Sequence, residues 1–289
     1  MPTDIALHSV EANGVTLNVA TAGEGPAVLL LHGFPHTWRL WTDVIGDLAR
    51  DHRVIAPDLR WLSARNPESG PEGGYGDGPE GGYDAGTLAA DAEALLAALG
   101  ETSAAVVGID AGTPPAFLLA MRRPDLVRRL VVMESLLGTL PGAEDFLAGG
   151  PPWWFGFHAV PGLAEEVLTG HEARYIGWFL DAGTLGQGLR AEVRDAFTAA
   201  YTGRPALRRA FGFYRALPDT ARQIRQAIAR TRLTVPTLAI GAHPVGAALE
   251  RQLRPIADDL AGHVIEDCGH IIPLHRPQAL LALLRPFLG

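Results

Sequence analysis

Asp110 stands between two glycines in the stretch Gly108-Ile109-Asp110-Ala111-Gly112, which continues an apolar run. This pattern is typical of a sharp strand-to-helix turn that exposes one side chain at its tip, and the glycines leave that side chain room. Serine is the usual occupant of such a tip and attacks carbonyl carbon. A carboxylate attacking a carbonyl would give only a reversible anhydride. We therefore expect Asp110 to attack saturated carbon and form an alkyl ester, which water then cleaves.

Other groups in the sequence suit the second step, the hydrolysis of that ester. His270 follows an apolar segment late in the chain, and a neutral imidazole there can take a proton from water. Phe34 follows an earlier apolar segment in His32-Gly33-Phe34-Pro35. Its backbone N–H and that of Ala111 are expected to form an oxyanion hole for the charge that develops when hydroxide adds.

A carboxylate should orient His270. Its usual position is directly after the apolar run 237–240, but the residues there, Gly241-Ala242-His243-Pro244, include no acid. Glu134 follows the preceding apolar run, 130–133. If both runs are strands of one sheet, the side chain of Glu134 can emerge at the same edge of that sheet. We predict that Glu134 orients the imidazole. Asp267 and Asp219 are weaker candidates for this role.

Two aromatic clusters, Trp153-Trp154-Phe155 and Phe211-Gly212-Phe213-Tyr214-Arg215, lie in the middle of the chain. Opening an epoxide requires hydrogen-bond donors for the developing alkoxide, and expelling a halide requires donors for the anion. The indole N–H of Trp154 and the phenol of Tyr214 are such donors on apolar side chains. The residues predicted to bind the substrate are Trp153, Phe155, Phe213 and His36. Packing in the hydrophobic core of this part of the chain is an equal alternative for Trp153 and Phe213.

Short apolar runs alternate with amphipathic segments, which favours a doubly wound α/β fold with a mostly parallel sheet. The expected strands are 27–31, 54–56, 104–109, 130–133, 237–240 and 263–266, after a hairpin of 7–10 and 16–21. The expected helices are 38–48, 87–99, 116–122 and 277–287. The alternation stops between 136 and 230, where the pattern is helical and aromatic. We interpret 136–230 as a helical cap, and 1–135 with 231–289 as the core domain.

Composition restricts the partners. The 289 residues are 47% hydrophobic and carry a net charge of −8, which argues against nucleic acid or an anionic membrane as partner. All 24 basic residues are arginine, which excludes lysine-dependent cofactor chemistry, and the single cysteine, Cys268, excludes a disulfide within the chain. We expect a cytoplasmic enzyme with no cofactor or metal that acts on a small neutral substrate, and a homodimer is an open alternative to a monomer. Residues 63–86, which repeat Pro-Glu-Gly-Gly-Tyr, are expected to form an exposed loop, with a substrate lid as the alternative.

Several stretches together resemble the α/β-hydrolase epoxide hydrolases, above all the bacterial Cif-type enzymes, and are also similar to haloalkane and fluoroacetate dehalogenases. These stretches are HGFPHTW, VIAPDLR, GIDAG, VVMES, FYRALPDTARQ and DCGHIIP. The resemblance implies an α/β-hydrolase fold with a cap inserted after the sixth strand, and hydrolysis of an epoxide to a vicinal diol. It also implies that Glu134 is the acid and Tyr214 a cap donor. Trp154 stands where the Cif-type enzymes have a histidine, which makes Tyr214 the expected proton source.

The substrate is expected to be a bulky apolar or aromatic epoxide. The Trp and Tyr pair resembles that of epoxide hydrolases acting on aromatic polyketide epoxides in secondary metabolism. One alternative is a haloalkane-type dehalogenase, although the arginines that hold haloacids are replaced by Ala111 and Pro114. Another is a catalytically silent fold that binds a small apolar ligand, against which the complete set of Asp110, Glu134 and His270 argues.

Overall fold

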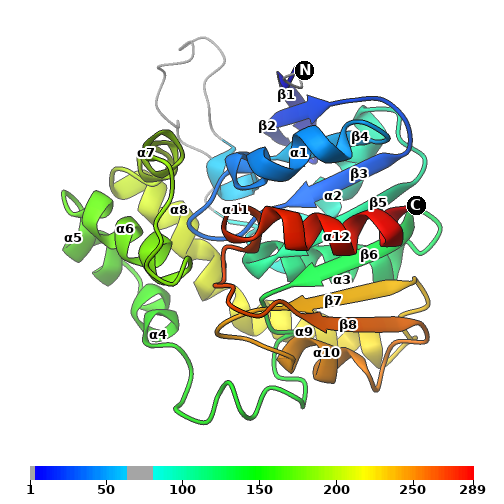
Figure 1. Ribbon diagram of the computed structural model, residues 1–289. Coiled ribbons are helices and arrows are strands. Elements are labelled where there is room, and N and C mark those ends of the chain that lie inside the picture. Colours follow the sequence, from blue (N-terminus) through cyan, green and yellow to red (C-terminus); the bar gives the residue numbers. More distant parts are fainter. Residues whose placement is uncertain (1–3, 64–80) are drawn as a thin grey trace.

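An eight-stranded sheet forms the centre of the molecule in the computed structural model, which describes residues 4–63 and 81–289 (Figure 1). The strands are β1 (Ala6–Ala12), β2 (Val15–Ala22), β3 (Ala27–Leu31), β4 (Arg53–Pro57), β5 (Ala104–Ile109), β6 (Val127–Met133), β7 (Thr237–Gly241) and β8 (Leu260–Val264). Their order across the sheet is β1-β2-β4-β3-β5-β6-β7-β8. The pairs β1-β2 and β2-β4 are antiparallel, and the other pairs are parallel. The predicted mostly parallel α/β fold is confirmed, although the last strand begins three residues and ends two residues earlier than expected.

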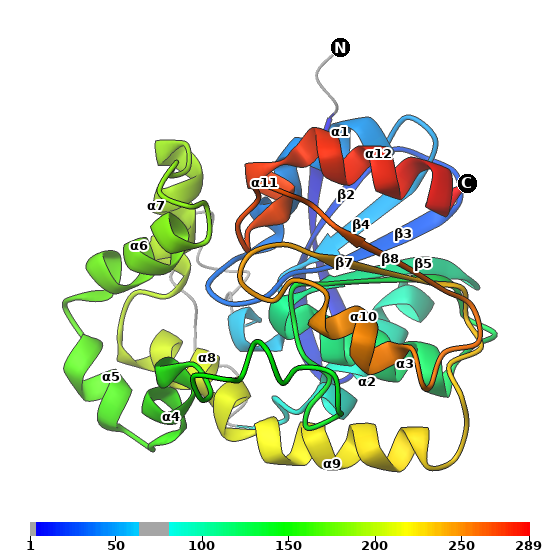
Figure 2. The same cartoon turned by 60° about the horizontal axis from the view of Figure 1, so that its bottom comes forward.

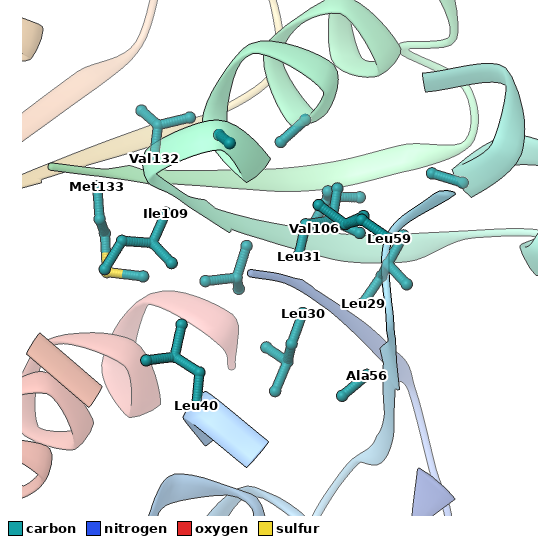
Figure 3. Close-up of a cluster of buried hydrophobic side chains, with 14 of the residues drawn as sticks. Leu29, Leu30, Leu31, Leu40, Ala56, Leu59, Val106, Ile109, Val132 and Met133 are labelled. Carbon is teal, nitrogen blue, oxygen red and sulfur yellow. The ribbon is translucent and has the colours of Figure 1, made fainter. Parts of the chain in front are cut away.

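The central strands consist of continuous apolar runs because both of their faces are covered. Every residue of β3 and β5 is buried. Figure 3 shows how Leu29, Leu30 and Val106 from these strands pack with side chains from the neighbouring elements. This packing fixes the carboxyl ends of the strands. The candidate site residues lie in the segments that begin there.

Helices cover the two faces of the sheet (Figures 1 and 2). On one face lie α1 (Thr42–Leu48), α11 (Ile272–His275) and α12 (Pro277–Leu288). On the other face lie α2 (Ala85–Ala98), α3 (Thr113–Arg122), α9 (Leu217–Ile228) and α10 (Ala248–Leu253). In residues 4–63 and 81–289, the short 3-10 helices are η1 (Trp38–Trp41), η2 (Arg60–Leu62) and η4 (Asp110–Gly112).

A helical insertion follows β6 and lies beyond one end of the sheet (Figures 1 and 2). Its helices are α4 (Trp153–Ala159), α5 (Leu163–Leu168), α6 (Glu172–Ala182), α7 (Ala191–Ala200) and α8 (Arg204–Arg215). The predicted insertion after the sixth strand is thereby confirmed. Its limits at 136 and 230 stay predictions, and α9 already packs against α2 and α3 of the core.

The first copy of the repeat, residues 71–75, lies outside the described residues, and the second copy lies only partly within them. The interpretation of this segment as a loop or lid therefore stays a prediction. Within 4–63 and 81–289, the structure contains no helix with the length and apolar character that crossing a bilayer requires.

Candidate active site

Asp110 lies at the tip of a tight turn between β5 and α3. Its φ of +53° is in the left-handed region, which costs a non-glycine residue roughly 1–2 kcal/mol. A Cβ at Gly108 would lie 2.4 Å from the carbonyl oxygen of Gly112, and a Cβ at Gly112 would lie 2.3 Å from that of Leu31. The backbone is thus packed too closely for side chains at 108 and 112. This close packing holds Asp110 in its strained conformation.

The carboxylate of Asp110 receives a hydrogen bond from the loop after β3. The backbone N–H of Phe34 donates to Asp110 Oδ2 at 2.8 Å. The carboxylate passes over Gly33, where a Cβ would lie 2.4 Å from the same oxygen. One of the two predicted oxyanion-hole donors therefore already binds the candidate nucleophile. Ala111, the other, is the residue after Asp110 in η4 and is buried.

His32 shapes this loop, a role that the sequence analysis did not assign. Its Nε2 accepts the backbone N–H of Leu59 at 3.0 Å, so the ring proton lies on Nδ1, which is 2.8 Å from the carbonyl oxygen of Gly33. Burial lowers the pKa of His32 to about 4, although the Gly33 carbonyl and the Asp110 charge oppose the shift. A neutral imidazole is therefore a fixed part of the loop. In the sequence, the signal for this structural role was that His32 is the first residue of the HGFP stretch.

Glu134 and His270 lie close together although they belong to distant segments of the chain. Glu134 directly follows β6 with a φ of +43°, and its side chain is fully buried. Its Oε2 lies 3.1 Å from His270 Nδ1, and its Oε1 accepts the backbone N–H of Ala242 at 2.5 Å. Ala242 lies in the segment where an acid is usual but absent, and it supplies a backbone N–H donor to Glu134 instead. Asp219 pairs with Arg222 on α9 instead, and Asp267 is exposed.

The other nitrogen of His270 faces Asp110. His270 Nε2 lies 3.9 Å from Asp110 Oδ2, beyond hydrogen-bond distance but within reach of electrostatic attraction. Burial by itself lowers the pKa of His270, but the carboxylates of Asp110 and Glu134 outweigh it and raise the pKa to about 10. The imidazole is therefore protonated at neutral pH. The side chains of Asp110 and His270 are 26% and 25% exposed, so both can be reached from outside.

Tyr214 lies on the cap side of this group. It is buried, and its ring meets that of Phe34 edge-on at 5.7 Å between centroids. Burial raises the pKa of Tyr214 well above its ordinary value, and the negative charge of Asp110 adds to the shift. The phenol therefore keeps its proton and is close enough to Asp110 to respond to its charge. Phe155 and Phe213 contact the same ring at 5.6 and 5.4 Å.

Trp154 and Trp153 lie further from this centre. Within the described residues, the ring of Trp154 meets those of Trp153, Phe155, Trp178 and Phe179, and none of its ring contacts is with Tyr214. Trp153 is 55% exposed on the outside of the cap. The ring of Phe155 thus lies in contact with both Trp154 and Tyr214, whereas in the described part of the chain none of the rings that Trp153 contacts is in contact with Tyr214.

His36 lies on the core side of the group. It is buried, and its ring meets Phe197 of α7 at 5.2 Å. Burial, followed by the charges of His270 and His32, lowers the pKa of His36 well below its usual value. Neither ring nitrogen forms a hydrogen bond with any described residue. A neutral imidazole with open donor and acceptor positions therefore stands near the predicted base.

Sequence reasoning also missed His158 and Tyr175, which lie beside Tyr214 in the cap. The ring centroid of His158 is 4.4 Å from that of Tyr214, and its Nε2 is 2.6 Å from the hydroxyl of Tyr175. Both residues stand among aromatic residues in amphipathic helices. From sequence alone, this setting does not distinguish a functional histidine from a core residue.

The comparisons with known proteins agree with this geometry. Residues 26–277 match the model of the alpha/beta hydrolase fold family. A soluble epoxide hydrolase from a Corynebacterium species is 28% identical over 97% of this chain and 96% of its own length. The structure of epoxide hydrolase A from Mycobacterium thermoresistibile is 26% identical, with a TM-score of 0.82 over 99% of this chain and 98% of that one. A variant of aCif is similar in fold, with a TM-score of 0.85 and 24% identity over 99% of this chain and 89% of its own.

Proposed function

The chain belongs to the alpha/beta hydrolase fold family, and on that premise we propose that it hydrolyses epoxides to vicinal diols through an alkyl ester on Asp110. The expected enzyme class, a hydrolase acting on ether bonds, is confirmed by relatives that match over the full length. The observation that carries the mechanism is the position of the carboxylate. It sits at the tip of a strained turn, receives the Phe34 N–H at 2.8 Å and faces His270 at 3.9 Å.

The hydrogen bond from Phe34 distinguishes the two oxygens of Asp110. Oδ2 is held by this N–H, so Oδ1 is the oxygen that attacks the epoxide carbon. The bond from that carbon to the epoxide oxygen breaks as the bond to Oδ1 forms. The epoxide oxygen takes the proton of Tyr214. Oδ2 then becomes the carbonyl oxygen of the ester and already occupies the oxyanion hole.

Ester formation also changes the state of His270. Esterification removes the negative charge of Asp110, one of the two carboxylates that raise the pKa of the imidazole. The pKa therefore falls, and the imidazolium releases its proton, which neutralises the Tyr214 phenolate. Before opening, His270 is cationic and Asp110 anionic, and afterwards both are neutral, so charge and protons balance. The base becomes available only once there is an ester to cleave.

Hydrolysis returns the enzyme to its first state. Neutral His270, held at Nδ1 by Glu134, takes a proton from water at Nε2. The hydroxide adds to the ester carbonyl, and the charge on Oδ2 is stabilised by the backbone N–H groups of Phe34 and Ala111. The diol oxygen leaves with the proton from His270. The remaining carboxylic acid of Asp110 returns its proton to the imidazole.

Bulky apolar or aromatic epoxides are the proposed substrates. The rings of Phe34, Phe155 and Phe213 surround Tyr214, and they favour an apolar group beside the reacting carbon. His36, with its unpaired nitrogens, is the polar group proposed to meet a substrate or water on the opposite side.

The decisive experiment is peptide mass spectrometry of a His270→Gln variant incubated with styrene oxide. Removal of the base should leave the ester intact, so the peptide with Asp110 gains the mass of the epoxide. An Asp110→Asn, His270→Gln double variant is the matched control and should gain none. An unmodified Asp110 peptide under conditions in which the wild type forms diol would refute this mechanism. Halide release from a bromoalkane without epoxide turnover would favour a dehalogenase.

A further inference from the structure

His158 occupies a position in the cap where aromatic rings surround it. It is fully buried on α4, with its ring stacked on Phe211 at 4.0 Å and an interplanar angle of 18°. Its ring also meets Tyr214 at 4.4 Å and Phe34 at 5.5 Å. A phenylalanine could make the same ring contacts. Packing alone therefore does not account for an imidazole at this position.

The polar atoms of His158 are held from one side only. Nε2 lies 2.6 Å from the hydroxyl of Tyr175, whereas Nδ1 is buried and has no hydrogen-bond partner in residues 4–63 and 81–289. Burial, and then the charge of Arg215, lowers the pKa of His158 to about 3, so the ring is neutral. Burial also keeps Tyr175 protonated by raising its pKa. A buried nitrogen without a partner is destabilising, and in native proteins such groups are few and often functional.

Tyr214 lies directly beside this imidazole. Its ring is contacted by the carbon rings of Phe34, Phe155 and Phe213 at 5.4–5.7 Å, and by His158 at the shorter distance of 4.4 Å. Its hydroxyl makes no hydrogen bond with any described residue. When Tyr214 gives up its proton, a phenolate forms among apolar rings, where an unsolvated charge is strongly disfavoured. Among these four rings in contact with Tyr214, the imidazole of His158 is the one with polar ring atoms.

We propose that His158, fixed by Tyr175, is a positioning residue for Tyr214 that orients the phenol and lowers the energy of its phenolate during epoxide opening. This inference rests on the function proposed above. The charged groups nearby support it, because Arg215 is the residue after Tyr214 and its charge acts on His158. Glu165 of α5 pairs with Arg215 and holds that cation in place. The inference also assigns the polar partner of Tyr214 to His158 rather than to Trp154.

The test separates the two chemical steps in single turnovers of styrene oxide with excess enzyme. His158→Phe keeps the ring but removes both nitrogens. Because this change removes an interaction of the opening step only, we expect ester formation on Asp110 to slow by about 10- to 100-fold, with ester hydrolysis unchanged within about twofold. Tyr175→Phe, which removes only the tether, should slow ester formation by less than His158→Phe. Trp178→Phe, at an exposed tryptophan of α6 with no assigned role, is the matched control and should leave both rates near the wild-type values. Trp154→Phe should slow ester formation by less than His158→Phe.

Several results would overturn the inference. They are wild-type rates in His158→Phe, equal slowing of both steps, and a larger effect of Trp154→Phe than of His158→Phe. Thermal unfolding of each variant checks that the cap remains folded, and Tyr175→Phe decides the question if His158→Phe is unstable. Absence of an ester in the wild-type enzyme would instead refute the proposed function. The two failures are therefore distinguishable.

Discussion

The core edge and the cap hold their candidate catalytic groups in different ways. At the core edge, the backbone fixes the groups, because Asp110 and Glu134 follow strands directly and the N–H groups of Phe34 and Ala242 bind their carboxylates. In the cap, Tyr214 is placed by ring packing, and the polar contact beside it is the pair of His158 and Tyr175. In the proposed mechanism, the covalent chemistry takes place at the rigid sheet edge. The proposed acid, Tyr214, stands in an aromatic cluster of the cap.

The largest effect is expected at the core edge, from Glu134→Gln. The amide oxygen can still accept the Ala242 N–H, which leaves the amide NH2 facing His270 Nδ1. This contact forces the ring proton onto Nε2, where it blocks proton transfer from water. Ester hydrolysis should slow by about 10²- to 10⁴-fold, as in other enzymes whose orienting carboxylate is replaced by an amide. Rapid-quench mass spectrometry should therefore detect the Asp110 ester, and rapid turnover without its accumulation would argue against a role for Glu134.

A smaller and step-specific effect is expected in the cap, from Tyr214→Phe. Loss of the proton donor should slow ester formation by about 10²-fold and leave ester hydrolysis within a few-fold of the wild type. The same single-turnover assay measures both rates. The distinction between the two regions fails if the variant slows hydrolysis as strongly as it slows ester formation.

Two glycine substitutions compare the rigidity of the regions. At Gly108 an added Cβ would lie 2.4 Å from a backbone oxygen, so Gly108→Ala should lower the free energy of unfolding by about 1–3 kcal/mol. Gly156 is exposed in α4 with no atom within 4 Å of an added Cβ. Gly156→Ala should therefore raise the free energy of unfolding by up to about 1 kcal/mol. Urea denaturation measures both changes in the free energy of unfolding. Equal changes for the two variants would show that the core edge and the cap do not differ in rigidity at these positions.

The last expected effect develops gradually with pH and is the pH dependence of stability contributed by His270. Its folded pKa of about 10 exceeds the ordinary value of 6.5, so the native state holds an extra proton between these limits. The stabilisation is complete below pH 6.5 and disappears as the pH rises through 10. The unfolding free energy of the wild type relative to His270→Gln should therefore fall by at most about 1.4 kcal/mol per pH unit in this window. A difference that stays constant would show that the imidazole is not held as a cation.

The contrast also explains what the sequence could predict. The turn at Asp110, the loop at Phe34 and the residues Glu134 and His270 are determined by where strands end, and strand ends can be recognised from apolar runs and glycines. The cap positions depend on which faces of several helices meet, which one sequence does not reveal. The sequence accordingly predicted the pair of Tyr214 and Trp154, and it did not reveal that His158 and Tyr175 lie beside Tyr214. The last strand was placed late because β8 begins with partly exposed residues that lack a continuous apolar run.

The central claim is that Asp110, and not water, forms the new bond to the epoxide carbon. It is tested most directly by a single turnover in water labelled with heavy oxygen, with enzyme in excess over styrene oxide. We predict that the diol from this first turnover contains no heavy oxygen and that the Asp110 carboxylate gains one heavy atom, located by peptide mass spectrometry. Heavy oxygen in the first diol together with an unlabelled Asp110 peptide would contradict the account.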